Sequence, residues 1–343
     1  AEGVRAAAEG MREAAAELRA EVRAEARAEA RADGVGTTRG ARRSPRNPAC
    51  RDEEDDERVV ALNALLQMDA ERATPVLEKV LARRDECSEV LRRKAVFLVA
   101  RTSTPRAADI LLRAARTDPD AEVREQAVFW LARVPGERTV TLLREIAAAG
   151  TAADTGVELR KRAVFALSQQ GSPAARAALR ELAASRTTPT EVRGEAIAWL
   201  GRRGDGGEDA QWLRQLWGSL ESRELKERAL QSLGRQKGST PWLLDVARDA
   251  REPIEVRQAA LSAAARTASV AELGALWEGT KERELKEALV LALARRKEPE
   301  ALDRLIAIAR TESDRELRKT AVFWLSRSKD PKALAYLQEV IER

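Results

Sequence analysis

Few residues of the chain have the types and spacing that catalysis requires. The 343 residues include no histidine, which excludes histidine-based triads, histidine general bases and histidine metal ligands. The glycine-rich run GVGTTRG (34–40) follows a helical pattern rather than a strand, so it does not match a phosphate-binding loop. The acidic run DEEDDE (52–57) lacks the ligand spacing of an EF-hand calcium loop. We therefore predict that the chain is not an enzyme and has no catalytic residue, cofactor, metal site or small-molecule substrate.

Both signs of charge are spread along the chain. Sixty-one basic and 56 acidic residues leave a net charge of +5, and 34% of all residues are charged while only 3% are aromatic. Mixed charge of this kind is typical of solvent-exposed helix faces. No apolar run is long enough to cross a bilayer, so we expect no membrane span.

One seven-residue pattern recurs along the chain. AVFWLAR occupies positions 127–133 and AVFWLSR occupies positions 321–327, with weaker copies between and before them. Alignment on the first residue of this pattern gives nine positions, 29 to 36 residues apart: Ala61, Ala95, Ala127, Ala163, Ala196, Ala229, Ala260, Leu289 and Ala321. A period in this range indicates a stacked-repeat architecture.

Each repeat contains two helical patterns separated by a turn. In AEVREQAVFWLAR (121–133), Val123, Ala127 and Leu131 share one helix face, and VPGE then interrupts the helix. The following segment RTVTLLREIAAAG (138–150) has a second helical pattern that Gly150 ends. A single helical pair cannot bury its apolar face alone, whereas stacked pairs form a continuous core.

These segments resemble a known repeat family. DPDAEVREQAVFWLARV (118–134), TEVRGEAIAWLGRRG (190–204), RELKERALQSLGRQ (223–236) and RELRKTAVFWLSRS (315–328) are similar to HEAT repeats, in the variant named after phycobilisome-lyase HEAT-like proteins. The resemblance implies an all-α, right-handed α-solenoid of about nine helical pairs over residues 55–343. We expect the first helices on its convex side and the second helices on its concave side. The resemblance implies no lyase activity, because no chromophore-handling residues can be matched.

The region before the repeats has a different composition. Residues 1–32 are almost wholly Ala, Glu and Arg, which favours a helix. A short heptad stripe runs along this helix, with Ala8 and Ala15 between its larger members Val4, Met11, Leu18 and Val22. We predict that this stripe makes the contacts of an N-terminal helical arm (1–32), joined by a Gly/Pro/Arg linker (33–54) to the repeats (55–343).

The two cysteines flank the first predicted helical pair. Cys50 lies just before its first helix and Cys87 just after its second. Because these ends of an antiparallel hairpin lie side by side, we predict a disulfide; the alternative is two unrelated buried thiols. A disulfide indicates an oxidising compartment. The Ala-Glu start fits a signal-peptidase product or an artefact of how the chain was made. We expect an exported protein, periplasmic or extracellular.

Aromatic residues are the main candidates for a contact surface. All four phenylalanines lie two positions after the aligned residue: Phe97, Phe129, Phe165 and Phe323. This position points roughly away from the core, so the phenylalanines predict an exposed apolar stripe for the arm or another molecule. The alternative is that each ring packs against the neighbouring first helix. Trp212 and Trp242, on second helices, are candidates for a concave peptide groove, although a core role is the simpler interpretation.

The function that fits these features is a non-enzymatic protein-interaction scaffold. Its arm and open C-terminal repeat favour head-to-tail self-association into an oligomer or filament. The alternatives are a monomeric scaffold that binds a peptide or protein on its concave face, and a nucleic-acid-binding protein. Nucleic acid is disfavoured, because the first 51 residues hold eleven Arg against eight acids, which leaves only +2 for the repeats. We therefore expect protein partners, with a second copy of the chain among the candidates.

Overall fold

The computed structural model describes residues 57–68, 70–85, 88–102, 105–149, 156–202 and 207–342. These residues belong to one compact unit, 51–343. All regular secondary structure in them is helical. The arm, the linker and both cysteines lie outside the described residues, so the predictions made for them stay predictions.

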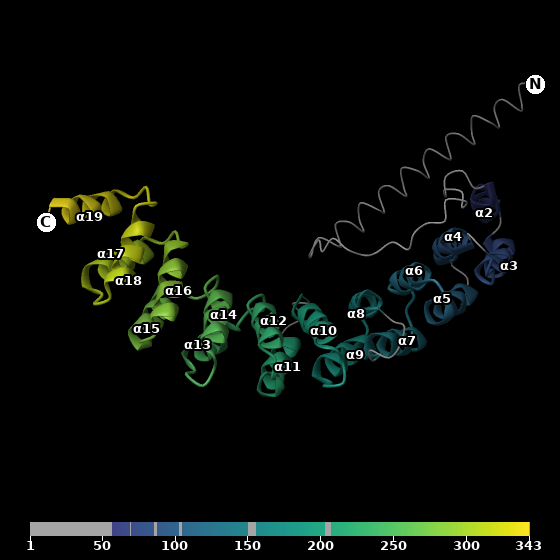
Figure 1. Ribbon diagram of the computed structural model, residues 1–343, viewed down its shortest axis with the longest axis horizontal. Helices are drawn as coiled ribbons and strands as arrows, with labels where there is room; N and C mark the ends of the chain where they lie inside the picture. Colours follow the sequence, from purple (N-terminus) through teal and green to yellow (C-terminus); the bar gives the residue numbers. More distant parts are fainter. Residues whose placement is uncertain are drawn as a thin grey trace, which may run out of the picture. The chain divides into compact units, whose positions relative to one another are not determined.

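The described helices form nine pairs, which follow one another along the unit from α2 and α3 to α18 and α19 (Figure 1). This confirms the predicted all-α solenoid. The first helices of the pairs are α2 (Glu57–Met68), α4 (Ser88–Arg101), α6 (Ala121–Leu131), α8 (Val157–Gln170), α10 (Thr190–Arg202), α12 (Arg223–Leu233), α14 (Ile254–Ala264), α16 (Arg283–Ala294) and α18 (Arg315–Leu325). The second helices are α3 (Ala70–Leu81), α5 (Pro105–Thr117), α7 (Glu137–Ala148), α9 (Pro173–Ala184), α11 (Glu208–Leu216), α13 (Thr240–Arg248), α15 (Val270–Gly279), α17 (Pro299–Thr311) and α19 (Pro331–Glu342). A short 3₁₀ turn, η1 (Trp217–Ser219), extends α11.

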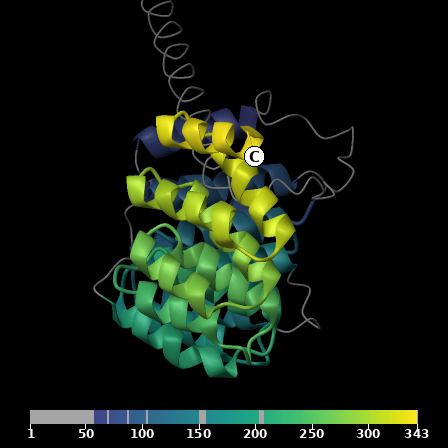
Figure 2. The same cartoon turned by 90° about the vertical axis from the view of Figure 1, so that its left-hand side faces the viewer.

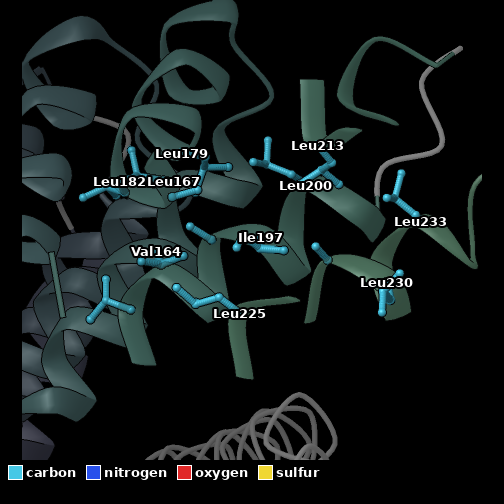
Figure 3. Packing of buried hydrophobic residues seen from close by; sticks show 14 of the residues in the cluster. Val164, Leu167, Leu179, Leu182, Ile197, Leu200, Leu213, Leu225, Leu230 and Leu233 are labelled. Atoms are coloured by element: carbon cyan, nitrogen blue, oxygen red, sulfur yellow. The ribbon is translucent and has the colours of Figure 1, made fainter. Parts of the chain in front are cut away.

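The repeated pattern corresponds to the core. Eight of the nine aligned residues are fully buried, and the exception is Ala61 on α2, where the neighbouring Leu62 is buried instead. The next position along the first helices from α4 to α16 is also buried, as Figure 3 shows for Val164, Ile197 and Leu230. Because successive pairs place the same positions inside, the stack shares one continuous apolar core.

Helix ends follow the expected capping chemistry. Asp120 accepts a hydrogen bond from the Val123 backbone N–H (2.9 Å) at the start of α6. Ser269 and Glu272 form a capping box at the start of α15. Gly171 ends α8 in a left-handed conformation with φ of 66°, which glycine adopts without steric cost. These signals explain why the turns fall where the sequence predicts them.

A cation three positions before the aligned residue links several neighbouring pairs. It reaches the acid that precedes the next first helix, in the pairs Arg92–Asp118 (3.0 Å), Lys226–Glu252 (2.6 Å), Arg257–Glu282 (2.6 Å) and Lys286–Glu312 (2.8 Å). Burial raises the pKa of Glu312, but hydrogen bonds from Lys286, from the Asp314 backbone and from Ser313 outweigh burial and lower this pKa to about 2. These ion pairs fix how neighbouring helical pairs pack, because both charged groups of each ion pair are held partly or fully out of water.

The first helices of neighbouring pairs approach one another more closely than the second helices do. A row of helices curves toward the side on which its members lie closer together. The first helices therefore lie on the inner side of each local bend. The predicted assignment, with second helices on the concave side, is wrong, because the small residues of the first helices allow the closer approach.

A close approach between α10 and α12 shows this effect. A methyl group added at Gly201 would lie 2.7 Å from the Cα atom of Ser232, well inside the normal separation of two carbon atoms. At this point Ser232 Oγ donates to the Ile197 carbonyl (3.1 Å) and Gln236 Nε2 donates to the Gly201 carbonyl (2.8 Å). The small residue after the repeat leucine thus allows the two first helices to approach closely at this point.

Candidate interaction surface on the first helices

A row of aromatic side chains crosses four neighbouring first helices. The ring of Phe129 on α6 stacks on that of Phe165 on α8, with centroids 6.2 Å apart and planes within 10°. Phe97 on α4 contacts Trp130 (5.6 Å), and Phe165 contacts Trp199 on α10 (5.4 Å). Phe129 and Trp130 pack edge to face at 5.3 Å. We call these five residues the aromatic ladder.

The exposure of the four phenylalanines differs along the stack. Phe97 is buried, with 6% of its surface exposed, whereas Phe129 and Phe165 are half-buried. Phe323 on α18 is 54% exposed and packs on Trp324. Each ladder ring covers part of its neighbour, so the rings pack between first helices and still leave a solvent-facing edge on α6 and α8. The buried Phe97 departs from the predicted exposed stripe, and the use of the stripe as a contact surface stays a prediction.

Cations flank the ladder. Lys94 Nζ lies 4.7 Å from the ring centroid of Phe97, the Arg133 guanidinium 4.8 Å from Trp130, and the Arg202 guanidinium 4.2 Å from Trp199. These distances lie within the range of cation–π attraction. The surface around the rings therefore carries positive charge at several points, beside acids such as Glu195, which accepts a hydrogen bond from Trp199 (2.8 Å).

One carboxyl close to the ladder has a perturbed pKa. Burial raises the pKa of Glu125 on α6, and the Arg162 guanidinium 3.1 Å away opposes this shift. Among the described residues, no group of three or more acidic or cysteine side chains is placed to hold a metal ion. No helix of the described ranges is long and apolar enough to span a membrane.

The two tryptophans predicted to form a groove lie on the second-helix side. Trp212 on α11 is half-buried beneath Arg180, whose guanidinium lies 5.7 Å from the ring. Trp242 on α13 packs edge to face on Trp217 at 5.3 Å. Beside Trp217 and Trp242 is an open hollow of about 400 Å³ that Arg248 also lines. The predicted groove would therefore lie on the convex side, and Trp212 does not line this hollow.

The remaining predicted contact residues, Val4, Met11, Leu18 and Val22, lie outside the described residues, as do Cys50 and Cys87. The structure therefore leaves the arm contact and the disulfide as predictions.

A row of arginines was not predicted from the sequence. Arginine recurs six positions after the aligned residue in seven of the eight first helices from α4 to α18, at or just beyond the helix C-terminus, and all seven are exposed: Arg101, Arg133, Arg202, Arg235, Arg266, Arg295 and Arg327. We call this row the basic edge. Its signal was present in the aligned repeats, but a net charge summed over the whole solenoid conceals it.

Comparison with known proteins identifies the repeats. A family model described as HEAT repeats matches residues 47–132, 77–155, 148–234 and 273–343. The chain belongs to the HEAT-repeat family. This confirms the predicted family, while the narrower likeness to phycobilisome-lyase HEAT-like repeats stays a prediction.

Two solved structures are similar to the chain. Human deoxyhypusine hydroxylase in complex with glycerol is 17% identical, with 80% of this chain and 92% of that one covered and a TM-score of 0.33. A homology model of the full-length AP-3 complex in an intermediate open conformation is 12% identical, with 83% and 56% covered and a TM-score of 0.42. The chain thus spans about half the length of the matched AP-3 chain. No curated protein matches the sequence.

Proposed function

We propose that the chain is a non-enzymatic scaffold that binds protein partners through the aromatic ladder. The observation that carries this proposal is the half-exposed stack of Phe129 on Phe165 in the solvent-facing register of two first helices. Aromatic side chains dominate the energetics of protein interfaces because a large apolar area is buried at a small entropic cost. HEAT-repeat solenoids are stacked arrays with long continuous surfaces, which suit this role.

The occupant we propose for the ladder is the N-terminal arm. The arm carries an apolar stripe of Val4, Met11, Leu18 and Val22 among Glu and Arg residues. An isolated helix of this composition is marginal in water, so docking of the stripe on apolar rings stabilises it. The arm binds either its own solenoid or that of a second copy, and the second case produces self-association.

Substitution of the two half-buried rings tests this proposal. In the Phe129→Ser, Phe165→Ser variant the arm loses its docking surface, so trypsin cleaves the arginines of residues 1–46 faster, and any self-association measured by light scattering is lost. The matched control is Val157→Ser, which replaces an exposed apolar residue of α8 that is not part of the ladder. Unchanged cleavage of the arm and unchanged mass in the double variant would contradict the proposal.

A second candidate function, end-to-end self-association, rests on a different observation. Seven large apolar side chains are exposed among the described residues, and six of them lie on the first or last pair. Val60 on α2 is 61% exposed, and Leu334 and Ile341 on α19 are 60% and 84% exposed. Figure 2 views the array from the side of α18 and α19, whose outer face no other described helix covers. We propose that this face docks on the first pair of another copy, a head-to-tail contact that builds rings or filaments.

Light scattering over a range of concentrations tests this second candidate. The parent chain forms species heavier than a monomer as its concentration rises, and the Leu334→Glu, Ile341→Glu variant stays monomeric because the contact face becomes charged. Val157→Glu is the matched control, since Val157 is also exposed but lies in the middle of the array. A parent chain that is monomeric at every concentration would exclude end-to-end assembly.

A further inference from the structure

The basic edge differs from the other charged surfaces of the array. Many cations on the second helices pair with acids of the neighbouring pair, for example Arg116 with Glu145 at 2.6 Å and Arg144 with Glu181 at 3.0 Å. In contrast, none of the arginines of the basic edge from α6 to α18 has a carboxylate within ion-pair distance among the described residues: Arg133, Arg202, Arg235, Arg266, Arg295 and Arg327. The second-helix row neutralises much of its own charge through these ion pairs, and the basic edge does not.

The centre of the basic edge brings like charges together. Although the Arg235 side chain is exposed as a whole, partial burial of its guanidinium and the positive charges of Arg202, Arg266 and Arg228 around it lower its pKa. Such mutual repulsion opposes folding, and no described acid relieves it. A surface lined by charges of one sign raises the local concentration of a ligand of the opposite charge.

Helix dipoles do not account for the basic edge. The C-terminus of a first helix favours a cation by a few tenths of a kcal/mol up to about 1 kcal/mol. However, the second helix of the same pair begins at that edge, and its N-terminus disfavours a cation to a similar extent. Further exposed lysines, Lys237, Lys297 and Lys329, lie in the turns between the two helices of a pair. The positive charge therefore exceeds what the helix ends favour.

We propose that the basic edge binds an extended acidic segment of a partner protein. The proposal rests on the scaffold function and adds the chemistry of the partner. Neighbouring helix axes are separated by about 10 Å, so each arginine would meet an acidic side chain at about every third residue of an extended chain, at roughly 3.3 Å per residue. Duplex DNA carries one charge per about 1.7 Å of its axis, which is several times denser than this row. The spacing favours an acidic peptide over nucleic acid.

Fluorescence anisotropy with two synthetic probes tests the proposal. The first probe is a labelled peptide that repeats Glu-Gly-Ser, and its uncharged counterpart repeats Gln-Gly-Ser. The full chain binds the Glu probe, with an affinity that falls between about 50 mM and about 200 mM salt as exposed charges become screened. It does not bind the Gln probe. Absence of binding to the Glu probe at low salt would overturn the proposal.

Two variants of equal charge localise the binding. Arg235→Gln, Arg266→Gln, Arg295→Gln removes three charges from the basic edge, away from the aromatic ladder, and weakens Glu-probe binding about tenfold or more. The control variant, Arg116→Gln, Arg144→Gln, Arg310→Gln, removes three paired charges from second helices and leaves the affinity within about twofold of the parent. An equal loss in both variants would show a response to net charge alone and overturn the proposal.

A thymidine oligonucleotide of the same length as the peptide is the third probe. If it binds more tightly than the Glu probe and with the same arginine dependence, the basic edge is a nucleic-acid surface and the proposal is wrong. The basic-edge variant keeps the melting temperature of the parent, because the relief of charge repulsion offsets the lost hydrogen bond from Arg266 to the Gly234 carbonyl (2.9 Å). The ladder variant Phe129→Ser, Phe165→Ser retains Glu-probe binding, so failure of this proposal is distinguishable from failure of the scaffold proposal.

Discussion

Two glycines of α10 allow a sharp test of how the first helices pack. Gly201 lies against α12, where an added Cβ would be 2.7 Å from the Cα atom of Ser232. Gly194 lies on the same helix, where an added Cβ would meet only the side chains of Arg228 and Leu225 at 3.7 and 3.8 Å. The two distances at Gly194 are ordinary van der Waals separations, whereas the distance at Gly201 is far shorter. The same substitution therefore acts in opposite directions at the two positions.

The magnitudes follow from this geometry. Gly201→Ala forces α10 and α12 apart by about 1 Å, and overpacking of this kind costs about 1–3 kcal/mol. The shift also strains the hydrogen bonds from Ser232 to Ile197 and from Gln236 to Gly201, each worth about 1 kcal/mol. The gain in helix propensity offsets less than about 1 kcal/mol near a helix end. We expect a net loss of about 2 kcal/mol for Gly201→Ala, and a gain of about 1 kcal/mol for Gly194→Ala.

Urea unfolding followed by circular dichroism measures both variants. Because stacked repeats can unfold in stages, the comparison uses the midpoint of the transition together with its slope. Adding Ser232→Gly to Gly201→Ala does not restore the stability of the parent, because the overlap with the backbone of residue 232 remains and the hydrogen bond from Ser232 to Ile197 is lost. A Gly201→Ala variant as stable as the parent would refute the close approach of the two first helices.

Three other outcomes test the ion pairs and the cysteines. Glu312→Gln lowers the melting temperature at pH 7 because Lys286 loses its partner. The pKa of Glu312 is about 2 in the folded protein, against 4.5 for the free side chain. The difference in melting temperature between variant and parent therefore shrinks as the pH falls from 4.5 toward 2. Asp118→Asn leaves the guanidinium of Arg92 buried without a carboxylate and lowers the free energy of urea unfolding by about 3–5 kcal/mol; a loss below about 1 kcal/mol would contradict this role. Mass spectrometry of the unreduced protein finds its two cysteines linked, and reduction lowers the stability by about 4 kcal/mol; two free thiols would disprove the disulfide.

The fold was predictable because the core positions of each pair are local in sequence. Each aligned residue from Ala95 to Ala321 lies on the apolar face of its own first helix, and helical periodicity alone determines this face. At Ala61 the alignment is displaced by one position, and Leu62 is buried instead. The curvature was predicted on the wrong side, because it depends on the relative spacing of the two helix rows, which no single repeat encodes.

The contact surface was predictable only in part. The register of Phe129 follows from the repeat, but the exposure of each phenylalanine depends on the next first helix in the stack. Phe97 is buried because Trp130, on the next first helix, packs against its ring. Phe323 is exposed because no described first helix follows α18.

The basic edge was missed for a different reason. Its arginines are separated by about thirty residues of mixed charge, so a running net charge shows nothing. Arg235, Arg266 and Arg295 lie at the edge where the first helices end. Many acids that balance their charge in the sequence lie at the opposite edge, in the first turns of the same helices, such as Glu224, Glu255 and Glu284. Aligning the repeats by position reveals the row.

The most direct test of the scaffold proposal is a photo-cross-link from the aromatic ladder. A benzoylphenylalanine in place of Phe129, in the otherwise intact chain, reports what covers the half-exposed edge of that ring. Our account predicts a cross-link to residues 1–32, within one chain or between two copies, and no such product from the same group placed at Val157 of α8. A probe at position 129 that reacts with neither the arm nor another protein chain would contradict the claim that the ladder is a protein-binding surface.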